Sequence, residues 1–537
     1  MNRVADRIAG TLAAHGVRHA FGIPGNDVLE LIRACADAGI AFTLAKSEPS
    51  AAFMADAVAH TTRQPAACIF ALGPGIANGA SGVAGALMER SPVIVLGGEM
   101  AGNRREIYNH QAFDHVAMMR PVTKYAAELN AERAGQQVAR ALDIALAHPQ
   151  GPVFLNCPAD ATRADSREAG PSMPVDVRRG SLTTDMAEQV RARIAAARRP
   201  IAIAGLGVLA DDAASMFARF VRAYRMPFLA SYKAKGVVGE GDPLCMGAVA
   251  LSPVVDEASL ALVRDADLIV LVGFDPIELR DAWLDAWAPD QEVISLDWAE
   301  QTHRIFQTGP QITGALDANL AALTPTEGAR SSGWSSDRLG AHRQRVAEIV
   351  RPRSPQGRIS PAALFHAVSR QVGPDRLMTV DVGAHRILAN HVIACHQPGQ
   401  LLQSNGLGCM GYAIPAAVGA ALATQKQVIA MLGDGCALMS LGELAVVAEK
   451  NLPVVSVILN DDDLALIDLK QNKMKMARQG VAFRSPDFAA IARGFGIAAD
   501  RVTAIDAFEA CLERALKGSA PHVIEAMVDP AEYWDQM

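Results

Sequence analysis

The sequence predicts an α/β protein made of three doubly wound parallel-sheet domains. The chain has 537 residues, more than one hydrophobic core usually supports. Short apolar runs alternate with helical patterns along its length, and two polar segments interrupt that alternation. Half of the residues are hydrophobic, only 5% are aromatic and 44 are glycines, a composition that suits helices packed closely on parallel sheets.

The first predicted domain covers residues 1–165. It opens with apolar residues Val4, Ile8 and Leu12 at helical spacing, so we expect a first helix of the fold and no secretion signal. The hydrophilic segment 165–184 is expected to be a linker. Apolar runs that predict strands occur at residues 19–23, 67–72, 92–96 and 152–156.

The second predicted domain covers residues 184–324 and the third covers residues 355–537. Between them, residues 324–354 are rich in Ser, Arg, Gly and Pro around one helical piece, and are expected to form a second linker. In the second domain, strands are expected at residues 200–204, 268–272 and 292–296. In the third domain, they are expected at residues 377–380, 428–432, 454–459 and 522–526.

Charge and cysteine usage exclude several classes of function. A formal net charge of -7 gives no basic surface field, so we expect no nucleic-acid partner. The eight cysteines form no Cys-x-x-Cys pair, a pattern typical of reduced thiols in a cytoplasmic protein without a zinc site. The uncharged stretch 406–424 is built mainly of Gly and Ala, so we do not expect it to span a membrane.

The most informative pattern lies in the third domain. Gly433, Asp434 and Gly435 follow one predicted strand directly, and Asn460 ends the next strand after a helical segment. A β-α-β crossover brings the carboxyl ends of neighbouring strands together, so Asp434 and Asn460 are expected side by side. Their hard oxygen atoms suit Mg²⁺, which commonly fills its remaining positions with phosphate oxygens. The pattern therefore predicts a magnesium-diphosphate site, although a bare Gly-Asp-Gly is more often an ordinary turn.

These residues resemble the signature of the acetolactate synthase and pyruvate decarboxylase superfamily, whose enzymes use thiamine diphosphate. The resemblance covers essentially the whole chain and implies a pyrimidine-binding domain, a Rossmann-like central domain and a diphosphate-binding domain, in that order. It implies that Asp434, the Asn460 side chain and the main-chain carbonyl of Asp462 bind Mg²⁺. Active sites between subunits are implied as well, and with them a homodimer or homotetramer.

The same resemblance assigns the activating carboxylate to Glu48. In the family, a glutamate in this place hydrogen-bonds the aminopyrimidine N1′ atom and so helps to remove the C2 proton of the cofactor. An ordinary reading remains, in which Ser47 and Glu48 only begin a helix. Many relatives carry His where this chain has Ser47, so proton handling or substrate fit is expected to differ.

Further residues match cofactor-binding positions of the family. Gly73 and Asn78 lie in the Gly-Pro-Gly region of the first domain, which is otherwise a plain turn. Met410 matches the residue that wedges between the two cofactor rings, and the Gly408 carbonyl matches the acceptor of the 4′-amino group, while a core Met is the plainer alternative. The remaining matches, along the diphosphate, are His385, Gly433, Gly435 and Cys436.

The substrate side resembles the catabolic, flavin-independent acetolactate synthases. His110 and Gln111 lie in the segment that reaches the active site from a partner subunit, and Gln471 lies where these synthases carry a Gln near the substrate. We therefore expect decarboxylation of a 2-keto acid, pyruvate, with carboligation to a second keto compound. The three carboxylates of residues 461–463 depart from the family and leave open another carboligase, a decarboxylase or a 2-hydroxyacyl lyase.

Two other functions are compatible with parts of the sequence. Gly205 and Gly207 follow a strand of the second domain as in nicotinamide-dependent dehydrogenases, but this partial Gly-x-Gly-x-x-Gly pattern is a weak signal. A non-catalytic regulatory subunit is the other rival. The presence of Glu48, Asp434 and Asn460 argues against it, because a chain without catalysis would have no need for all three.

Overall fold

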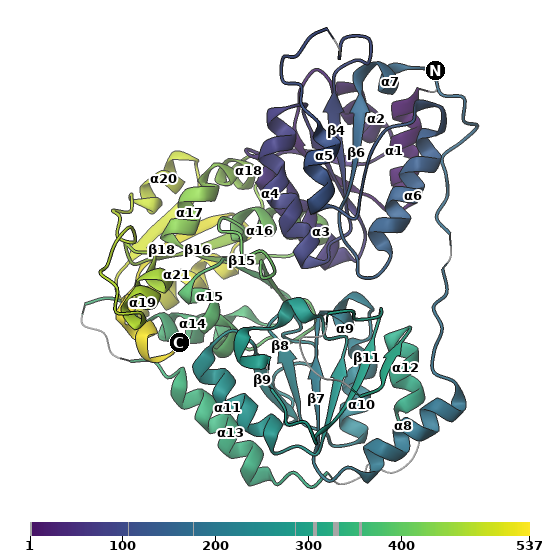
Figure 1. The fold of residues 1–537 in the computed structure, drawn as a ribbon. Coiled ribbons are helices and arrows are strands. Elements are labelled where there is room, and N and C mark those ends of the chain that lie inside the picture. Colours follow the sequence, from purple (N-terminus) through teal and green to yellow (C-terminus); the bar gives the residue numbers. More distant parts are fainter. Residues whose placement is uncertain are drawn as a thin grey trace.

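The structure is a computed structural model that describes residues 3–105, 107–175, 177–284, 286–303, 309–325, 332–353 and 357–537. The described residues form three units, each built on one six-stranded sheet, which we call the first, middle and third domains. Figure 1 shows them as three lobes in contact, with a long connection running from the first domain to the middle one. Residue 355, the predicted start of the third domain, lies outside the described residues.

In the first domain, the strand order is β2-β1-β3-β4-β6-β5 and all neighbouring strands run parallel. Its strands are β1 (His19–Ile23), β2 (Ala41–Leu44), β3 (Ala66–Phe70), β4 (Val93–Glu99), β5 (Tyr125–Glu128) and β6 (Val153–Pro158). Its helices are α1 (Val4–Ala14), α2 (Leu29–Asp37), α3 (Glu48–Thr62), α4 (Pro74–Glu89), α5 (His115–Met119), η1 (Arg120–Val122), η2 (Ala131–Arg133), α6 (Ala134–Leu146) and α7 (Ala159–Arg163).

The third domain repeats this strand order as β14-β13-β15-β16-β18-β17, again fully parallel. Its strands are β13 (Leu377–Val380), β14 (Leu401–Gln403), β15 (Val428–Gly433), β16 (Val454–Asn460), β17 (Ala498–Val502) and β18 (His522–Met527). Its helices are α14 (Pro361–Val372), α15 (Ala384–Val392), α16 (Ala413–Thr424), α17 (Asp434–Ser440), η5 (Leu441–Glu443), α18 (Leu444–Glu449), α19 (Ala465–Lys473), α20 (Phe488–Gly494), α21 (Ile505–Lys517) and η6 (Pro530–Asp535).

The middle domain has the order β12-β11-β10-β7-β8-β9, which is the strand order of dinucleotide-binding folds. Its strands are β7 (Pro200–Ala204), β8 (Phe228–Ser231), β9 (Cys245–Val249), β10 (Leu268–Val272), β11 (Glu292–Asp297) and β12 (Gln311–Thr313). Its helices are α8 (Thr184–Ala196), α9 (Leu206–Ala210), α10 (Ala214–Ala223), α11 (Pro253–Arg264), η3 (Pro276–Glu278), η4 (Asp281–Trp283) and α12 (Leu316–Leu323). Helix α13 (Ser336–Ile349), inside the second predicted linker, packs on this domain, because His342 contacts the Met246 carbonyl at 2.9 Å.

One hydrophobic cluster runs through both the first and the third domain. Helix α3 packs directly on α16, and these helices present mostly Ala, Gly and Val to each other. Gly419 permits the close approach, because a Cβ atom there would lie 2.2 Å from the Met54 carbonyl oxygen. Residues 413–424 of the uncharged stretch thus form an interdomain helix, and no helix among the described residues is long and apolar enough to cross a membrane.

The fold places the predicted ligand residues at one sheet edge. Strands β15 and β16 are parallel neighbours in which Gly433 pairs with Leu459, so Asp434 and Asn460 follow at the same level. Strand β13 lies on the other side of β15, and the chain order reverses between these two strands. Such a reversal opens a crevice at the carboxyl ends of the strands, where α/β proteins bind their ligands.

Candidate active site

A pocket of about 120 Å³ opens at this crevice, and we call it the third-domain pocket. It brings together six of the residues predicted to bind the cofactor, although they come from three separate segments of the chain. The six are His385, Met410, Gly433, Asp434, Gly435 and Cys436. Asn460, Asp462 and Gly408 lie next to these residues in the fold and do not line the cavity itself.

Asp434 is held rigidly at the base of the pocket. Its carboxylate accepts hydrogen bonds from Gly435 N and Asp462 N, both at 2.8 Å, and from Ser485 Oγ at 2.7 Å. Burial raises the pKa of Asp434 above its ordinary value, although these three bonds act in the opposite direction. A bound cation would oppose that shift and favour the charged carboxylate.

Of the two polar atoms in the Asn460 side chain, one has a hydrogen-bond partner and the other has none among the described residues. Its Nδ2 donates to Glu525 Oε1 at 2.8 Å, whereas Oδ1 is buried without a hydrogen-bond partner among the described residues. A buried amide oxygen without a partner costs about 1–3 kcal/mol. Because the oxygen sits beside Asp434 at the strand ends, a metal ion is the kind of ligand that would satisfy it.

The three carboxylates of residues 461–463 have different surroundings. Asp462 has a left-handed backbone with φ 59°, and its side chain accepts from Ser485 N at 3.0 Å. Asp463 is paired with Arg478, which also contacts Asp468. Asp461 lines the pocket, and burial together with the nearby Asp434 raises its pKa to about 8. Of the three carboxylates, Asp463 thus has its charge balanced by an ion pair.

His385 presents a neutral imidazole to the pocket. Burial, with a contribution from Arg386, lowers its pKa to about 3. The ring packs on the backbone of two loops, since a Cβ atom on Gly383 would lie 2.7 Å from it and one on Gly433 would lie 3.2 Å away. Its Nε2 atom has no partner within the described structure, which leaves a donor or acceptor available for a ligand.

The loop that carries Gly408 and Met410 is anchored by Asp381, whose role the sequence analysis did not identify. The Asp381 carboxylate accepts from Gly411 N at 3.1 Å and from Ala413 N at 2.9 Å. Met410 reaches toward Gly435, where a Cβ atom would touch its methyl group at 3.4 Å. Cys436, also in the pocket wall, directs its thiol to the Val382 carbonyl at 3.1 Å.

Glu48 begins helix α3 and is buried, with 9% of its surface exposed. Its Oε2 accepts a 2.6 Å hydrogen bond from Asn78 Nδ2, which joins two residues that the family resemblance assigned to the cofactor. Ser47 does cap the helix, as the ordinary reading expected, because its hydroxyl accepts from Ser50 N. Glu443 of the third domain fixes this turn by accepting from Lys46 N and Ser47 N.

A second cavity, of about 810 Å³, opens at the carboxyl ends of β1, β3 and β4, and we call it the first-domain pocket. Gln111 lines it in a left-handed conformation with φ 60°. Gly73, also at positive φ, must lack a side chain because a Cβ atom there would lie 2.8 Å from Gln111. His110 is exposed beside Tyr108 and does not line the pocket.

Gln471 lines neither pocket. Its side-chain amide forms two hydrogen bonds with the backbone of Gln479, at 2.8 and 3.1 Å. These bonds tie α19 to the following segment and leave the amide occupied. The predicted place of Gln471 near the substrate is therefore not supported by its contacts in this chain.

Three family models match successive parts of the chain, one in each domain. The descriptions are thiamine pyrophosphate enzyme N-terminal TPP binding domain for residues 2–118, central domain for residues 187–323, and C-terminal TPP binding domain for residues 381–526. The catabolic acetolactate synthase of Raoultella terrigena is 30% identical over 98% of this chain and 95% of its own length. The chain belongs to the thiamine-diphosphate-dependent enzymes.

Other relatives point to the same group. Acetolactate synthase isozyme 2 large subunit of Escherichia coli is 28% identical over 98% of this chain and 96% of its own length, and the acetolactate synthase of Bacillus subtilis is 26% identical over 98% and 93%. As a thiamine-diphosphate enzyme of this group, the protein acts on small keto acids by decarboxylation and carboligation. The identities are too modest to fix the substrate.

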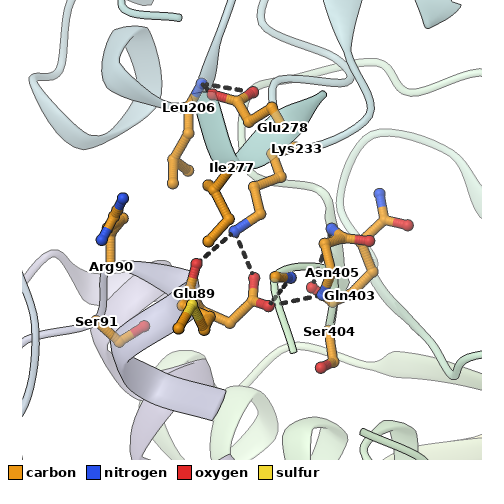
Figure 2. Close-up of polar contacts among 12 residues, drawn as sticks. Glu89, Arg90, Ser91, Leu206, Lys233, Ile277, Glu278, Gln403, Ser404 and Asn405 are labelled. Carbon is orange, nitrogen blue, oxygen red and sulfur yellow. Dashed lines mark hydrogen bonds and ion pairs between the residues drawn. The ribbon is translucent and has the colours of Figure 1, made fainter. Parts of the chain in front are cut away.

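In this thiamine-diphosphate enzyme, one carboxylate joins all three domains. Glu89 ends helix α4, and its Oε1 accepts from Asn405 N at 2.6 Å and Gly406 N at 2.8 Å, while Lys233 of the middle domain pairs with Oε2 at 2.9 Å (Figure 2). Both charged side chains are buried. Glu89 therefore fixes the start of the loop that leads to Gly408 and Met410.

The middle domain of this enzyme does not present the open phosphate-binding turn of a dehydrogenase. In a dehydrogenase, the N–H group at the position of Leu206 would bind a phosphate of the dinucleotide. Here the Leu206 N–H donates to the Glu278 carboxylate at 2.9 and 3.1 Å (Figure 2). Glu278 is fully buried, and a Cβ atom on Gly205 would lie 2.4 Å from the Gly273 carbonyl oxygen. The glycines of this turn serve the packing of two loops, which argues against the dehydrogenase reading.

Proposed function

We propose that this enzyme binds thiamine diphosphate with Mg²⁺, activates it through Glu48, and joins pyruvate to a second keto compound with loss of CO2. The observation that carries the cofactor and metal assignment is the unsatisfied Asn460 Oδ1 atom next to Asp434. The similarity to acetolactate synthases over nearly the whole chain supports the reaction. Another thiamine-diphosphate carboligase, decarboxylase or 2-hydroxyacyl lyase with a different substrate is the alternative.

For Mg²⁺, the proposed ligands are the Asp434 carboxylate, the Asn460 amide oxygen and the Asp462 carbonyl oxygen. Carboxylate, amide and carbonyl oxygens are the ligand types that Mg²⁺ accepts, with phosphate and water oxygens completing its shell. Among the described residues, the Asp462 carbonyl accepts one long hydrogen bond, at 3.3 Å from Phe483 N, and a carbonyl oxygen has a second lone pair to offer. The residues present therefore fit the ion.

For the cofactor, the third-domain pocket supplies the diphosphate end. We propose that Gly433, Gly435 and Cys436 provide close backbone contact there and that the neutral His385 hydrogen-bonds a phosphate oxygen through its free Nε2 atom. Met410 would separate the two cofactor rings. The Gly408 carbonyl would accept from the 4′-amino group.

Glu48 is proposed to hold the proton at N1′ of the cofactor, with Asn78 fixing its carboxylate. When bound, thiamine diphosphate supplies the carbon nucleophile and stores the electrons released by decarboxylation. The protein residues contribute orientation, exclusion of water and placement of this proton. Gly73 shapes the loop beside them.

The two halves of this site are proposed to come from two chains. Gly75 lies at the Glu48 end of α4, where a Cβ atom would be 3.4 Å from Glu48 Oε1, whereas Gly85 lies beside Cys409 of the Gly408 loop. Ten helical residues separate these glycines by about 15 Å. One aminopyrimidine ring cannot reach over that distance, so Glu48 of one chain and Gly408 of another would meet at the cofactor. A homodimer or homotetramer follows, with Gln111 and His110 entering from the partner side.

We also propose that the protein is cytoplasmic and that its three domains cover residues 1–165, 184–324 and 355–537. All eight cysteines are free, which supports a reducing compartment. Gln471 has no support from its contacts as a substrate residue, and its role stays a prediction.

The test is an assay of the purified protein with pyruvate, thiamine diphosphate and Mg²⁺, without added flavin. CO2, acetaldehyde and acetolactate are measured together. Acetolactate that forms in step with CO2 is the expected result. Acetaldehyde in place of acetolactate would support a decarboxylase, and no turnover of pyruvate despite cofactor binding would contradict the proposed substrate.

A further inference from the structure

The first-domain pocket contains charged side chains that the proposed cofactor chemistry does not use. Its volume, about 810 Å³, is far larger than a pyruvate side chain requires. Two of the lining carboxylates, Asp27 and Glu99, are buried, with 9% and 4% of their surface exposed. The other charged residues that line it are exposed, and they are Arg104, Asp160 and Arg163.

This pocket lies directly beside the activating carboxylate. A Cβ atom on Gly75 would be 3.4 Å from Glu48 Oε1 and 3.5 Å from the Ala71 side chain. A Cβ atom on Gly25 would in turn be 2.8 Å from Ala71 and 2.6 Å from Asp27 Oδ1. Glu48 Oε1 and Asp27 Oδ1 thus both lie within about 7 Å of the Ala71 side chain.

The backbone is shaped to admit the Asp27 carboxylate. Its Oδ2 accepts from Leu72 N at 2.9 Å, and a Cβ atom on Gly98 would lie 1.6 Å from the same oxygen. Any other residue at position 98 would displace the carboxylate. A single turn-stabilising hydrogen bond could be made by a neutral side chain, so it does not account for the burial of a charge.

Glu99 next to it is already satisfied. Burial alone would raise the pKa of Glu99, but hydrogen bonds from His115 and Asn156 and from Met100 N lower it to about 2. The contacts are 3.0 Å to His115 Nδ1, 3.0 Å to Asn156 Nδ2 and 2.7 Å to Met100 N. Glu99 is therefore ionised, and its charge adds to that of Asp27.

Asp27 has only backbone donors among the described residues. Burial raises the pKa of Asp27 and Glu99 adds to the effect, whereas hydrogen bonds from Leu72 N and from its own backbone N–H, together with His115, oppose it. At the rim, Asp160 accepts from Gly102 N and Arg163 donates to the Asn26 carbonyl, both in contact with solvent. Water screens these rim charges, whereas the buried floor with its two carboxylates keeps a negative potential.

We propose that this pocket admits the side chain of a 2-keto acid whose far end carries a positive charge, and that Asp27 is the residue that selects it. The proposal rests on the proposed function, because it names the substrate class of the same active site. A cation would compensate both buried carboxylates, and a charged hydrogen-bond donor could bond Asp27 directly. A neutral or anionic side chain of equal length would leave the Asp27 charge buried and unpaired.

The test measures the consumption of three matched keto acids in the presence of pyruvate, thiamine diphosphate and Mg²⁺. They are 2-keto-5-guanidinopentanoate, its neutral ureido counterpart and 2-ketoadipate. Wild type is compared with Asp27→Asn and with Asp143→Asn, a control on the exposed face of α6. In wild type, kcat/KM for the guanidino compound should exceed that for the ureido compound at least tenfold. In Asp27→Asn, the two values should be equal, and cofactor binding should be as tight as in wild type.

Equal or faster use of the ureido compound or of 2-ketoadipate by wild type would overturn the proposal, and so would an unchanged ratio in Asp27→Asn. If no keto acid is consumed, pyruvate included, the proposed function fails by itself. The charge preference is then decided by calorimetric binding of the same three compounds to wild type and to Asp27→Asn. No difference among them would overturn the selection by Asp27.

Discussion

Asn460 Nδ2 donates a 2.8 Å hydrogen bond to Glu525 Oε1, and the other branch of the same amide, Oδ1, has no hydrogen-bond partner among the described residues. Glu525 accepts from Ala489 N as well, so its own position is fixed. The bond to Nδ2 prevents the amide from turning over. Glu525 therefore orients the oxygen of Asn460 for a ligand at the β15 and β16 strand ends.

Replacing Asn460 by Ala should raise the Mg²⁺ concentration needed for thiamine diphosphate binding by more than tenfold, because a metal ligand is lost. Glu525→Ala should raise it about tenfold, as expected for loss of a residue that orients a ligand. Calorimetric titration of cofactor at several Mg²⁺ concentrations measures both. Asn472→Ala, an exposed change on α19, serves as the control. An unchanged Mg²⁺ requirement in Asn460→Ala would contradict the metal assignment.

Ser485 tests the hydrogen bonds that hold Asp434. Ser485→Ala removes the 2.7 Å bond to Asp434 Oδ2 and should weaken cofactor binding in Mg²⁺ by about tenfold, since a bond to a charged group contributes about 1.5–3 kcal/mol. Ser485→Thr keeps the hydroxyl and should bind within about threefold of wild type. Equal loss in both variants would show that packing, and not the hydroxyl, is what matters.

Substitution of Glu89 tests the contacts by which this carboxylate connects the three domains. Glu89→Gln leaves the buried Lys233 charge uncompensated and should lower stability by about 3–5 kcal/mol. It should also weaken cofactor binding, because Asn405 N and Gly406 N lose a charged acceptor. The double variant Glu89→Gln with Lys233→Met removes the stranded charge and should recover much of the stability. Chemical unfolding of all three proteins measures this, and a double variant no more stable than Glu89→Gln would contradict the ion-pair account.

Glu278 gives a pH-dependent prediction. Burial raises its pKa from 4.5 to about 8, so between these values the folded chain binds more protons than the unfolded chain. Its contribution to stability is therefore complete below pH 4.5 and is lost as the pH rises toward 8, by at most about 1.4 kcal/mol per pH unit. Glu278→Gln should flatten this slope in unfolding curves recorded from pH 5 to 8. An equally steep slope in the variant would contradict it.

Sequence periodicity predicted most of the buried interior strands, although it missed β8. The expected strands at residues 200–204, 268–272 and 377–380 coincide with β7, β10 and β13, because central strands of parallel sheets are continuous apolar runs. Edge strands were not predicted. The edge strands β2 and β17, for example, expose part of their side chains and carry polar residues, so they lack that signal.

The candidate site was predictable only where motifs lie at strand ends. Asp434 and Asn460 could be paired from the β-α-β topology, and the register of β15 and β16 places them at one level. Ser485, Asp381 and Glu89 could not be foreseen, because their contacts join segments that are distant in sequence and carry no local pattern. Asp27 belongs to no motif in the sequence, so the room that two glycines make for its carboxylate could not be foreseen either.

The most direct test of the central claim is the hydrogen-deuterium exchange rate at C2 of the bound cofactor, measured by rapid quenching and NMR in wild type and in Glu48→Gln. Glu48→Gln should bind thiamine diphosphate with nearly unchanged affinity, while the exchange slows by about 10²-fold or more because the N1′ proton is no longer controlled. Exchange at the wild-type rate in Glu48→Gln would contradict the activating role of Glu48.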